Sequence, residues 1–293
     1  MFRPASPLRR FFALLGWTPH SSYLLAAFLL VCVLIVYFWW PLAQQVLAYF
    51  DWRGQWWRYF DWLLVGIFFV MSLLIMARAD LRTDALIVFV ATIGGLVIEA
   101  WGTQTNLWFY FTSERPPLWI VPAWPIATLS IDRITRLLSW LVDRATTKDS
   151  QALKLFPLRN LVPACPRALG VVFKVLYWLT FVGFYGLMLY FVAPTFHKTY
   201  TLASLALCAV LILTPADYRK AWLIFLAGAG LGYFLELWGT TRQCWTYYTY
   251  QTPPLFAVLA HGMAAVSFWR AGLLVSAVLS RLKGFLVMKT RSA

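Results

Sequence analysis

Residues 79–118 read ADLRTDALIVFVATIGGLVIEAWGTQTNLWFYFTSERPPL, and residues 216–255 read ADYRKAWLIFLAGAGLGYFLELWGTTRQCWTYYTYQTPPL. Shifted by 137 positions, the two stretches align without a gap and share 16 identical residues out of 40. The shared residues include Glu-x-Trp-Gly-Thr, a following Trp and Tyr, and Pro-Pro. Chance similarity between apolar helices matches Leu or Ile, but not this combination. The sequence therefore indicates that the chain contains two copies of one unit.

The composition of the whole chain is that of a membrane protein. Of the 293 residues, 61% are hydrophobic and 12% are charged, whereas a soluble domain has about 45–50% apolar and about 25% charged residues. This excludes a soluble globular enzyme and a disordered or fibrous protein, and it predicts an all-α polytopic membrane protein. Because a spanning helix needs about 20 mainly apolar residues, we expect eight transmembrane helices, at 22–47, 59–77, 84–101, 118–141, 169–193, 198–214, 220–238 and 255–279.

Basic residues are distributed unevenly between the two sides that these spans define. If the N-terminus is cytoplasmic, five of the 25 Lys and Arg residues fall on the outer side, namely Arg53, Arg58, Arg115, Lys198 and Arg242. Cytoplasmic loops of membrane proteins are enriched in Lys and Arg. We therefore expect both termini in the cytoplasm and the protein in the inner membrane. The net charge of +14 favours contact with anionic membrane lipids over binding of nucleic acid.

The spans also predict how the copies are arranged. Each copy has four spans, an even number, so both should insert the same way up and form parallel four-helix repeats. We expect the first repeat at 1–142 and the second at 169–293, joined by a basic linker at 143–168. Nothing in the sequence indicates a protein partner.

Each copy places a carboxylate near the outer end of its third span, Glu99 and Glu236. In the last turn of a helix the dipole disfavours a negative charge, and partial burial disfavours it as well. An ionisable residue inside a membrane is a candidate functional residue. Glu99 and Glu236 are therefore candidate catalytic acids. The alternative is an interfacial Glu that is hydrogen-bonded to a neighbouring Thr or Trp.

Aromatic residues follow each Glu in the outer loops at 104–117 and 241–254. An aromatic belt at the membrane interface explains many of them. They could also form a pocket whose ring faces hold an apolar chain or a transient cation. The candidate substrate-binding residues are Trp101, Thr103, Trp108, Tyr110, Trp238, Thr240, Arg242, Trp245 and Tyr247. Gly102 and Gly239 are expected to permit the turn after the helix.

His261 occupies the position in the second copy that Trp124 has in the first. It lies within reach of Glu236, and a Glu–His pair can exchange a proton, so His261 is the third candidate catalytic residue. A packed histidine is the alternative. Asp132, Arg133 and Arg136 are expected to snorkel and pair at the inner end of the fourth span. The sequence has no metal-ligand spacing and no nucleotide or flavin motif, so we expect no metal and no cofactor.

Glu99-x-x-Gly102-Thr103-x-Thr105, followed by Tyr110, Thr112 and Val121-Pro122-x-Trp124, resembles the membrane proteins of carotenoid biosynthesis of the carotenoid 1,2-hydratase kind. The likeness covers about 25 residues of the first copy, and the second copy retains Glu236, Gly239, Thr240 and Tyr247. The resemblance implies an apolar isoprenoid or lipid substrate and a catalytic acid at Glu99 or Glu236.

Three functions remain open on the sequence alone. The first is a membrane enzyme that acts on an apolar lipid or isoprenoid, with a Glu as the acid and aromatic rings that stabilise a developing cation. The second is a proton-coupled transporter whose halves are the two copies. The third is a non-enzymatic scaffold or assembly factor that uses the duplicated outer edge as a docking surface.

Overall fold

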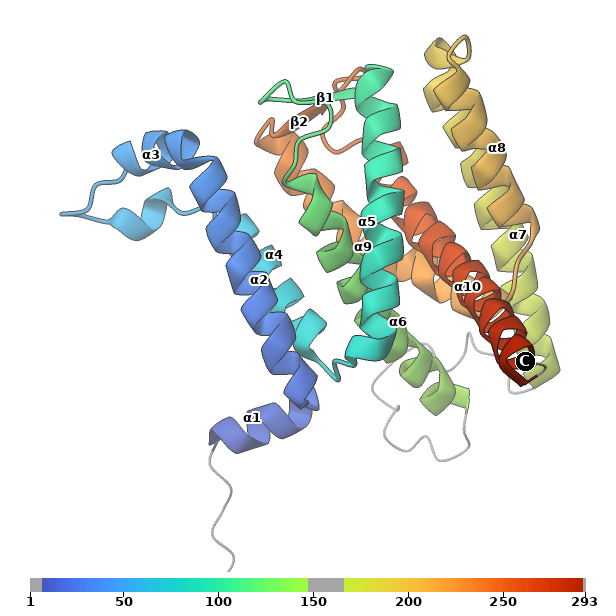
Figure 1. Ribbon diagram of the computed structural model, residues 1–293. Helices are drawn as coiled ribbons and strands as arrows, with labels where there is room; N and C mark the ends of the chain where they lie inside the picture. Colours follow the sequence, from blue (N-terminus) through green and yellow to red (C-terminus); the bar gives the residue numbers. More distant parts are fainter. Residues whose placement is uncertain (1–6, 147–165, 292–293) are drawn as a thin grey trace, which may run out of the picture.

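The computed structural model describes residues 7–146 and 166–291, and the fold is all-α, as predicted (Figure 1). The helices are α1 (Pro7–Leu15), α2 (Pro19–Phe38), α3 (Trp40–Ala48), α4 (Trp62–Met76), α5 (Leu81–Gln104), α6 (Ile120–Thr146), α7 (Pro166–Val192), α8 (Thr199–Leu213), α9 (Tyr218–Thr241) and α10 (Leu255–Arg291). Short 3₁₀ helices lie at Trp56–Tyr59 and Ala193–Thr195, and two strands are β1 (Trp108–Tyr110) and β2 (Trp245–Tyr247). Most of the expected linker at 143–168 lies outside the described residues.

Five of the described helices, α2, α5, α7, α9 and α10, are long and apolar enough to cross a membrane. The apolar helices α4 and α8 have only 15 residues each, and α6 carries Asp132, Arg133 and Arg136 in its middle turns. The expected continuous helix at 22–47 is wrong, because the chain breaks at Trp39 between α2 and α3. Pro41 explains the break, since proline has no N–H to donate and clashes with the preceding turn.

Several elements recur in the structure with the spacing of the sequence identities. α4 and α8 begin and end 137 positions apart, and so do α5 and α9 and the strands β1 and β2. Asp80 and Asp217 cap the N-termini of α5 and α9 by accepting backbone N–H bonds from Arg82 and Lys220, as an aspartate ahead of a helix is expected to do.

Glu99 does not lie in the last turn of its helix, which corrects the sequence-based prediction. α5 continues to Gln104, five residues beyond Glu99, and α9 continues to Thr241, five residues beyond Glu236. The effect of the helix dipole is confined to the last turn. The dipole therefore does little at either carboxylate, and their burial and hydrogen-bond partners decide their chemistry.

The two aromatic loops pair with each other instead of remaining separate. β1 and β2 form an antiparallel ladder in which Phe109 faces Thr246, its counterpart at the 137-residue shift. The hydrogen bonding continues beyond the strands, because the Phe111 N–H donates to the Cys244 carbonyl and the Tyr248 N–H donates to the Leu107 carbonyl. Figure 1 shows this ladder at one end of the helices, where it joins the two halves of the chain.

The helices around this ladder divide into a central group and two flanks. α5 packs on α6, α9 packs on α10, and α6 also packs on α9. In Figure 1, α2 and α4 lie on one side of this group and α7 and α8 on the other. The apolar core cluster draws residues from both halves, including Met71 and Ile131 of the first and Phe181 and Phe225 of the second.

Arg133 pairs with Asp132, as predicted, but it is buried and does not snorkel, which corrects that part of the prediction. Its guanidinium lies 2.6 Å from Asp84 of α5 and 2.6 Å from Asp132, and only 3% of its side chain is exposed. A buried arginine needs such partners, because an unpaired charge in an apolar medium is very costly. The arrangement ties α5 to α6 in the first half. The second half has Ala221 in place of Asp84, and its Arg270 donates to Thr214.

Candidate functional site

Glu99 lies inside the protein, 5% exposed, at the centre of a cluster of hydrogen-bond donors. Its Oε2 accepts from Trp108 Nε1 at 3.0 Å and from the Tyr110 hydroxyl at 2.7 Å. Its Oε1 accepts from Trp124 Nε1 at 3.1 Å. Both oxygens are therefore bound by side chains from the strand and from α6. We call Glu99 and these three donors the Glu99 cluster.

Glu236 has the corresponding surroundings and is 2% exposed. Its Oε2 accepts from Trp245 Nε1 at 2.9 Å, and its Oε1 accepts from the Tyr247 hydroxyl at 2.9 Å. The third partner is His261, whose Nε2 lies 2.9 Å from Oε1. We call these residues the Glu236 cluster. The structure thus brings the three candidate catalytic residues into one region, with His261 in contact with Glu236.

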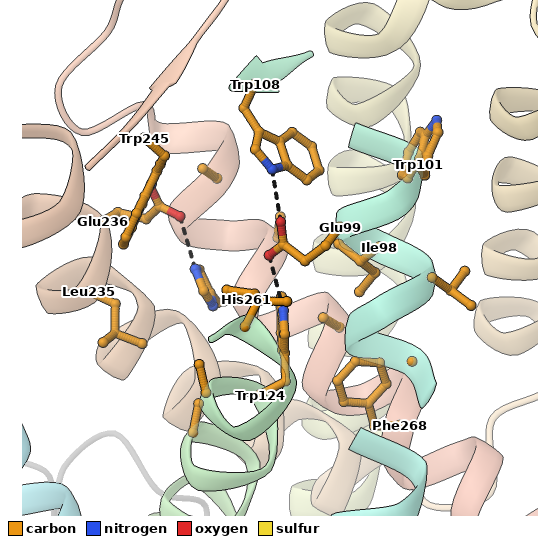
Figure 2. A pocket seen from close by; sticks show the side chains of 18 of the residues that line it. Ile98, Glu99, Trp101, Trp108, Trp124, Leu235, Glu236, Trp245, His261 and Phe268 are labelled. Atoms are coloured by element: carbon orange, nitrogen blue, oxygen red, sulfur yellow. Dashed lines mark hydrogen bonds and ion pairs between the residues drawn. The ribbon is translucent and has the colours of Figure 1, made fainter. Parts of the chain in front are cut away.

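Trp124 and His261 come from corresponding positions of α6 and α10, and their rings stack on each other with centroids 5.5 Å apart. Figure 2 shows the two rings below the carboxylates, with dashed lines from Glu99 to Trp124 and from Glu236 to His261. Each ring packs on a glycine of the facing helix. A Cβ at Gly95 would lie 2.4 Å from Trp124, and one at Gly232 would lie 2.5 Å from His261.

Gly102 and Gly239, which follow the carboxylates, lie within α5 and α9. The prediction that they permit a turn after the helix is therefore wrong. A Cβ at Gly102 would lie 1.9 Å from the Trp108 ring, and one at Gly239 would lie 2.0 Å from the Trp245 ring. Each indole therefore lies flat against its helix at a point where no other residue type fits. This close approach brings the indole nitrogen to the carboxylate.

Both carboxylates and His261 line a cavity of about 790 Å³. Its wall is almost entirely apolar, and among the described residues that line it there is no Lys or Arg. Besides the Glu99 and Glu236 clusters, side chains from α2, α4, α5, α6, α7, α8, α9 and α10 line the wall. A cavity of this size and character, with a few converging polar groups, is typical of a small-molecule site.

Not all candidate substrate-binding residues face this cavity. The hydroxyls of Thr103 and Thr240 are buried and donate to the backbone carbonyls of Glu99 and Glu236 within their own helices. Trp101 lines the cavity wall, but its indole N–H donates to Thr201 of α8 at 3.0 Å. Trp108, Tyr110, Trp245 and Tyr247 line the cavity and contact the carboxylates.

Arg242 lies away from Glu236 and pairs with Asp61, the residue before α4. Asp61 Oδ2 accepts from Arg242 Nε at 2.9 Å and from Trp238 Nε1 at 2.9 Å. Burial alone would raise the pKa of Asp61, but the hydrogen bonds from Arg242, the Leu64 N–H and Trp238 outweigh it and hold this pKa below the usual value. The pair therefore fastens the residue before α4 to the C-terminal end of α9.

The phenols of Tyr110 and Tyr247 stay protonated donors. Burial is the main cause that raises the pKa of Tyr110 well above its ordinary value, and the charge of Glu99 adds to it. The same holds for Tyr247, where burial and then Glu236 raise the pKa. A phenolate is thus disfavoured at both sites, and each hydroxyl remains able to donate to its carboxylate.

Sequence reasoning missed Trp124 and Asp61 as contributors to this region. Trp124 holds the place of His261 at the 137-residue shift, and this correspondence was a signal for its role. Asp61 carries no such signal, because its partners lie more than 170 positions away. No family model, curated protein or solved structure matches the chain.

Proposed function

We propose that the protein is an integral membrane enzyme that carries out acid–base chemistry on an apolar isoprenoid or lipid with a carbon–carbon double bond. The observation that carries the proposal is the Glu236–His261 contact, 2.9 Å long and open to an apolar cavity. Such a pair holds a transferable proton beside a site that excludes water. The resemblance of residues 99–124 to carotenoid-biosynthesis membrane proteins supports the same class of substrate.

The reaction begins when the pair gives its proton to one carbon of the double bond. The π electrons form the new C–H bond, and the neighbouring carbon becomes positive. The Trp and Tyr rings around the cavity stabilise this cation through their negative faces. Loss of a proton from an adjacent carbon then forms a new double bond and returns the proton to the pair. The sequence of steps is redox-neutral and needs no co-reactant.

Glu99 has a different role in this scheme. Its partners Trp108 and Trp124 are indoles, which can only donate a hydrogen bond, and Tyr110 stays protonated. None of these three donors can take up a proton from Glu99. Glu99 therefore serves to hold two indoles and a phenol at the cavity wall, while Glu236 and His261 move the proton.

The architecture we propose has eight transmembrane helices in two parallel four-helix repeats. The protein lies in the inner membrane, with both termini in the cytoplasm. The recurrence of α4, α5 and β1 as α8, α9 and β2, each 137 positions on, supports the repeats. The antiparallel ladder, with counterparts facing each other, supports a two-fold axis along the membrane normal. The excess of Lys and Arg on the inner side supports the orientation.

Lipid extracts from cells with and without the protein, analysed by mass spectrometry, test the function. We expect an apolar lipid to change into an isomer of equal mass, and Glu236→Gln to abolish the change while the protein still accumulates in the membrane. Glu114→Gln is the matched control, because Glu114 lies outside the cavity wall, in the loop after β1, where it accepts a hydrogen bond from the Thr112 hydroxyl. Full activity of Glu236→Gln would falsify the proposal. An unchanged lipid profile in all strains would instead favour a scaffold or a transporter.

A further inference from the structure

The cavity extends far beyond the two carboxylates along one side of the protein. Its lining on α5 runs from Glu99 back to Phe89, ten residues, and its lining on α10 runs from His261 to Val275, fourteen residues. At 1.5 Å per residue these distances are about 15 Å and about 21 Å. α8 contributes Leu207 and Cys208 to the same wall. We call this part of the cavity the α5–α8–α10 arm.

The arm is open toward the surroundings of the helices. Phe89, Ile93 and Val97 lie four residues apart on one face of α5, line the cavity, and are about half exposed. Leu207 of α8 and Leu274 of α10 line it and are about half exposed as well. These exposed side chains are all apolar, and on transmembrane helices such side chains face the hydrocarbon of the bilayer.

The outer end of the same region is closed. The β1–β2 ladder covers it with Leu107, Trp108 and Tyr247, all buried. α5 and α8 are joined there by the Trp101–Thr201 hydrogen bond and by Lys198, whose Nζ lies 3.3 Å from the Gln104 carbonyl. A molecule in the outer aqueous phase therefore meets a hydrogen-bonded cover, while a molecule in the bilayer meets an apolar opening.

We propose that the substrate enters sideways from the bilayer, between α5 and α8, and travels along the α5–α8–α10 arm to the carboxylates. Ile93 and Val97 form one edge of this entrance and set its width. This inference rests on the proposed function only for the identity of the substrate, an apolar lipid or isoprenoid. An apolar molecule dissolved in the bilayer never leaves hydrocarbon on this path, so it pays no cost of transfer through water.

Photolabelling with an alkyl diazirine dissolved in liposomes that contain the full-length protein tests the entrance without any turnover. Peptide mass spectrometry then measures labels on Ala260 and Ala264, which line the interior of the cavity. We expect Val97→Trp to lower this labelling several-fold and Val97→Ala to leave it equal or higher. Phe234→Trp is the matched control, because Phe234 is the counterpart of Val97, is similarly exposed and lies outside the cavity wall.

The outcomes separate this inference from the proposed function. Labelling in Val97→Trp equal to that in the unmodified protein overturns the entrance, and so does an equal loss in Phe234→Trp. Glu236→Gln should label like the unmodified protein, since it changes no residue of the entrance. If Glu236→Gln remains fully active in cells while Val97→Trp blocks labelling, the proposed chemistry is wrong and the entrance stands.

Discussion

The Glu99 and Glu236 clusters take their partners from corresponding positions but differ in one of them. Both carboxylates bind a Trp and a Tyr from a paired strand, 9 and 11 residues further along the chain. The third partner, 25 residues along, is Trp124 in one cluster and His261 in the other. Indole only donates a hydrogen bond, whereas imidazole can donate, accept or carry a proton. One substitution thus separates a carboxylate held only by donors from one whose partner can exchange a proton.

The largest expected effect follows from removing this difference. His261→Trp gives the Glu236 cluster the same partners as the Glu99 cluster, so it should abolish proton exchange while Glu236 keeps three hydrogen bonds. General acid–base catalysis contributes about 10²–10⁴-fold, and we expect activity on the lipid to fall by that factor. The amount of folded protein in the membrane is measured alongside. A fully active His261→Trp protein would show that the difference between the clusters has no catalytic meaning.

A second difference between the halves is the buried pair of Asp84 and Arg133. Arg133→Leu leaves Asp84 buried without its cation, and removing one partner of such a pair costs about 3–5 kcal/mol of unfolding free energy. Arg270→Leu is the matched control, because Arg270 donates only to Thr214 among the hydrogen bonds described for it. We expect denaturation in detergent to show a much smaller loss for Arg270→Leu. The double variant Asp84→Ala with Arg133→Leu should regain most of the stability.

Gly102→Ala and Gly239→Ala test whether the shared part of the clusters is equally tight. Each added methyl group would overlap the ring of Trp108 or Trp245, and overpacking costs about 1–3 kcal/mol. Thermal unfolding should show similar losses for the two variants, and tryptophan fluorescence should report a displaced indole. Gly183→Ala in α7 is the control, since nothing lies within 4 Å of its added Cβ. Losses as large in Gly183→Ala would contradict the explanation.

The smallest effect concerns Asp61, which has Lys198 as its counterpart at the 137-residue shift. Arg242 is half exposed, and pairs of this kind contribute about 0.2–1 kcal/mol. The folded-state pKa of Asp61 lies below its ordinary value, so the contribution is present above about pH 4 and is lost as the pH falls through the folded-state pKa. Asp61→Asn should therefore lower the unfolding temperature slightly at pH 7 and leave it unchanged at pH 2.

The helices and the ionisable residues of the site were predictable from the sequence, for physical reasons. Long apolar segments predict helices by themselves. Glu99, Glu236 and His261 stand out because charged and imidazole side chains are rare in such segments. The 137-residue repeat added the correspondence of Trp124 with His261.

The remaining features depend on contacts between distant segments. The pairing of β1 with β2 joins residues such as Phe109 and Thr246. A strand of three residues is too short to show the alternation of apolar and polar residues by which strands are predicted from sequence. The Asp84–Arg133 pair depends on how two helices are rotated against each other. A glycine near the end of a helix, such as Gly102, is usually read as the residue after the helix. In the structure α5 continues past Gly102, and the glycine makes room for the Trp108 ring.

The β1–β2 ladder has a consequence for the origin of the two unlike clusters. It is an isologous contact, in which a segment meets its own counterpart across a two-fold axis, with Phe109 opposite Thr246. Two separate molecules of a single half could in principle form the same ladder, as a symmetric homodimer. In a homodimer the stacked residues must be identical, two Trp or two His. When the two segments are encoded separately, as they are within this chain, position 124 can carry an indole and position 261 an imidazole.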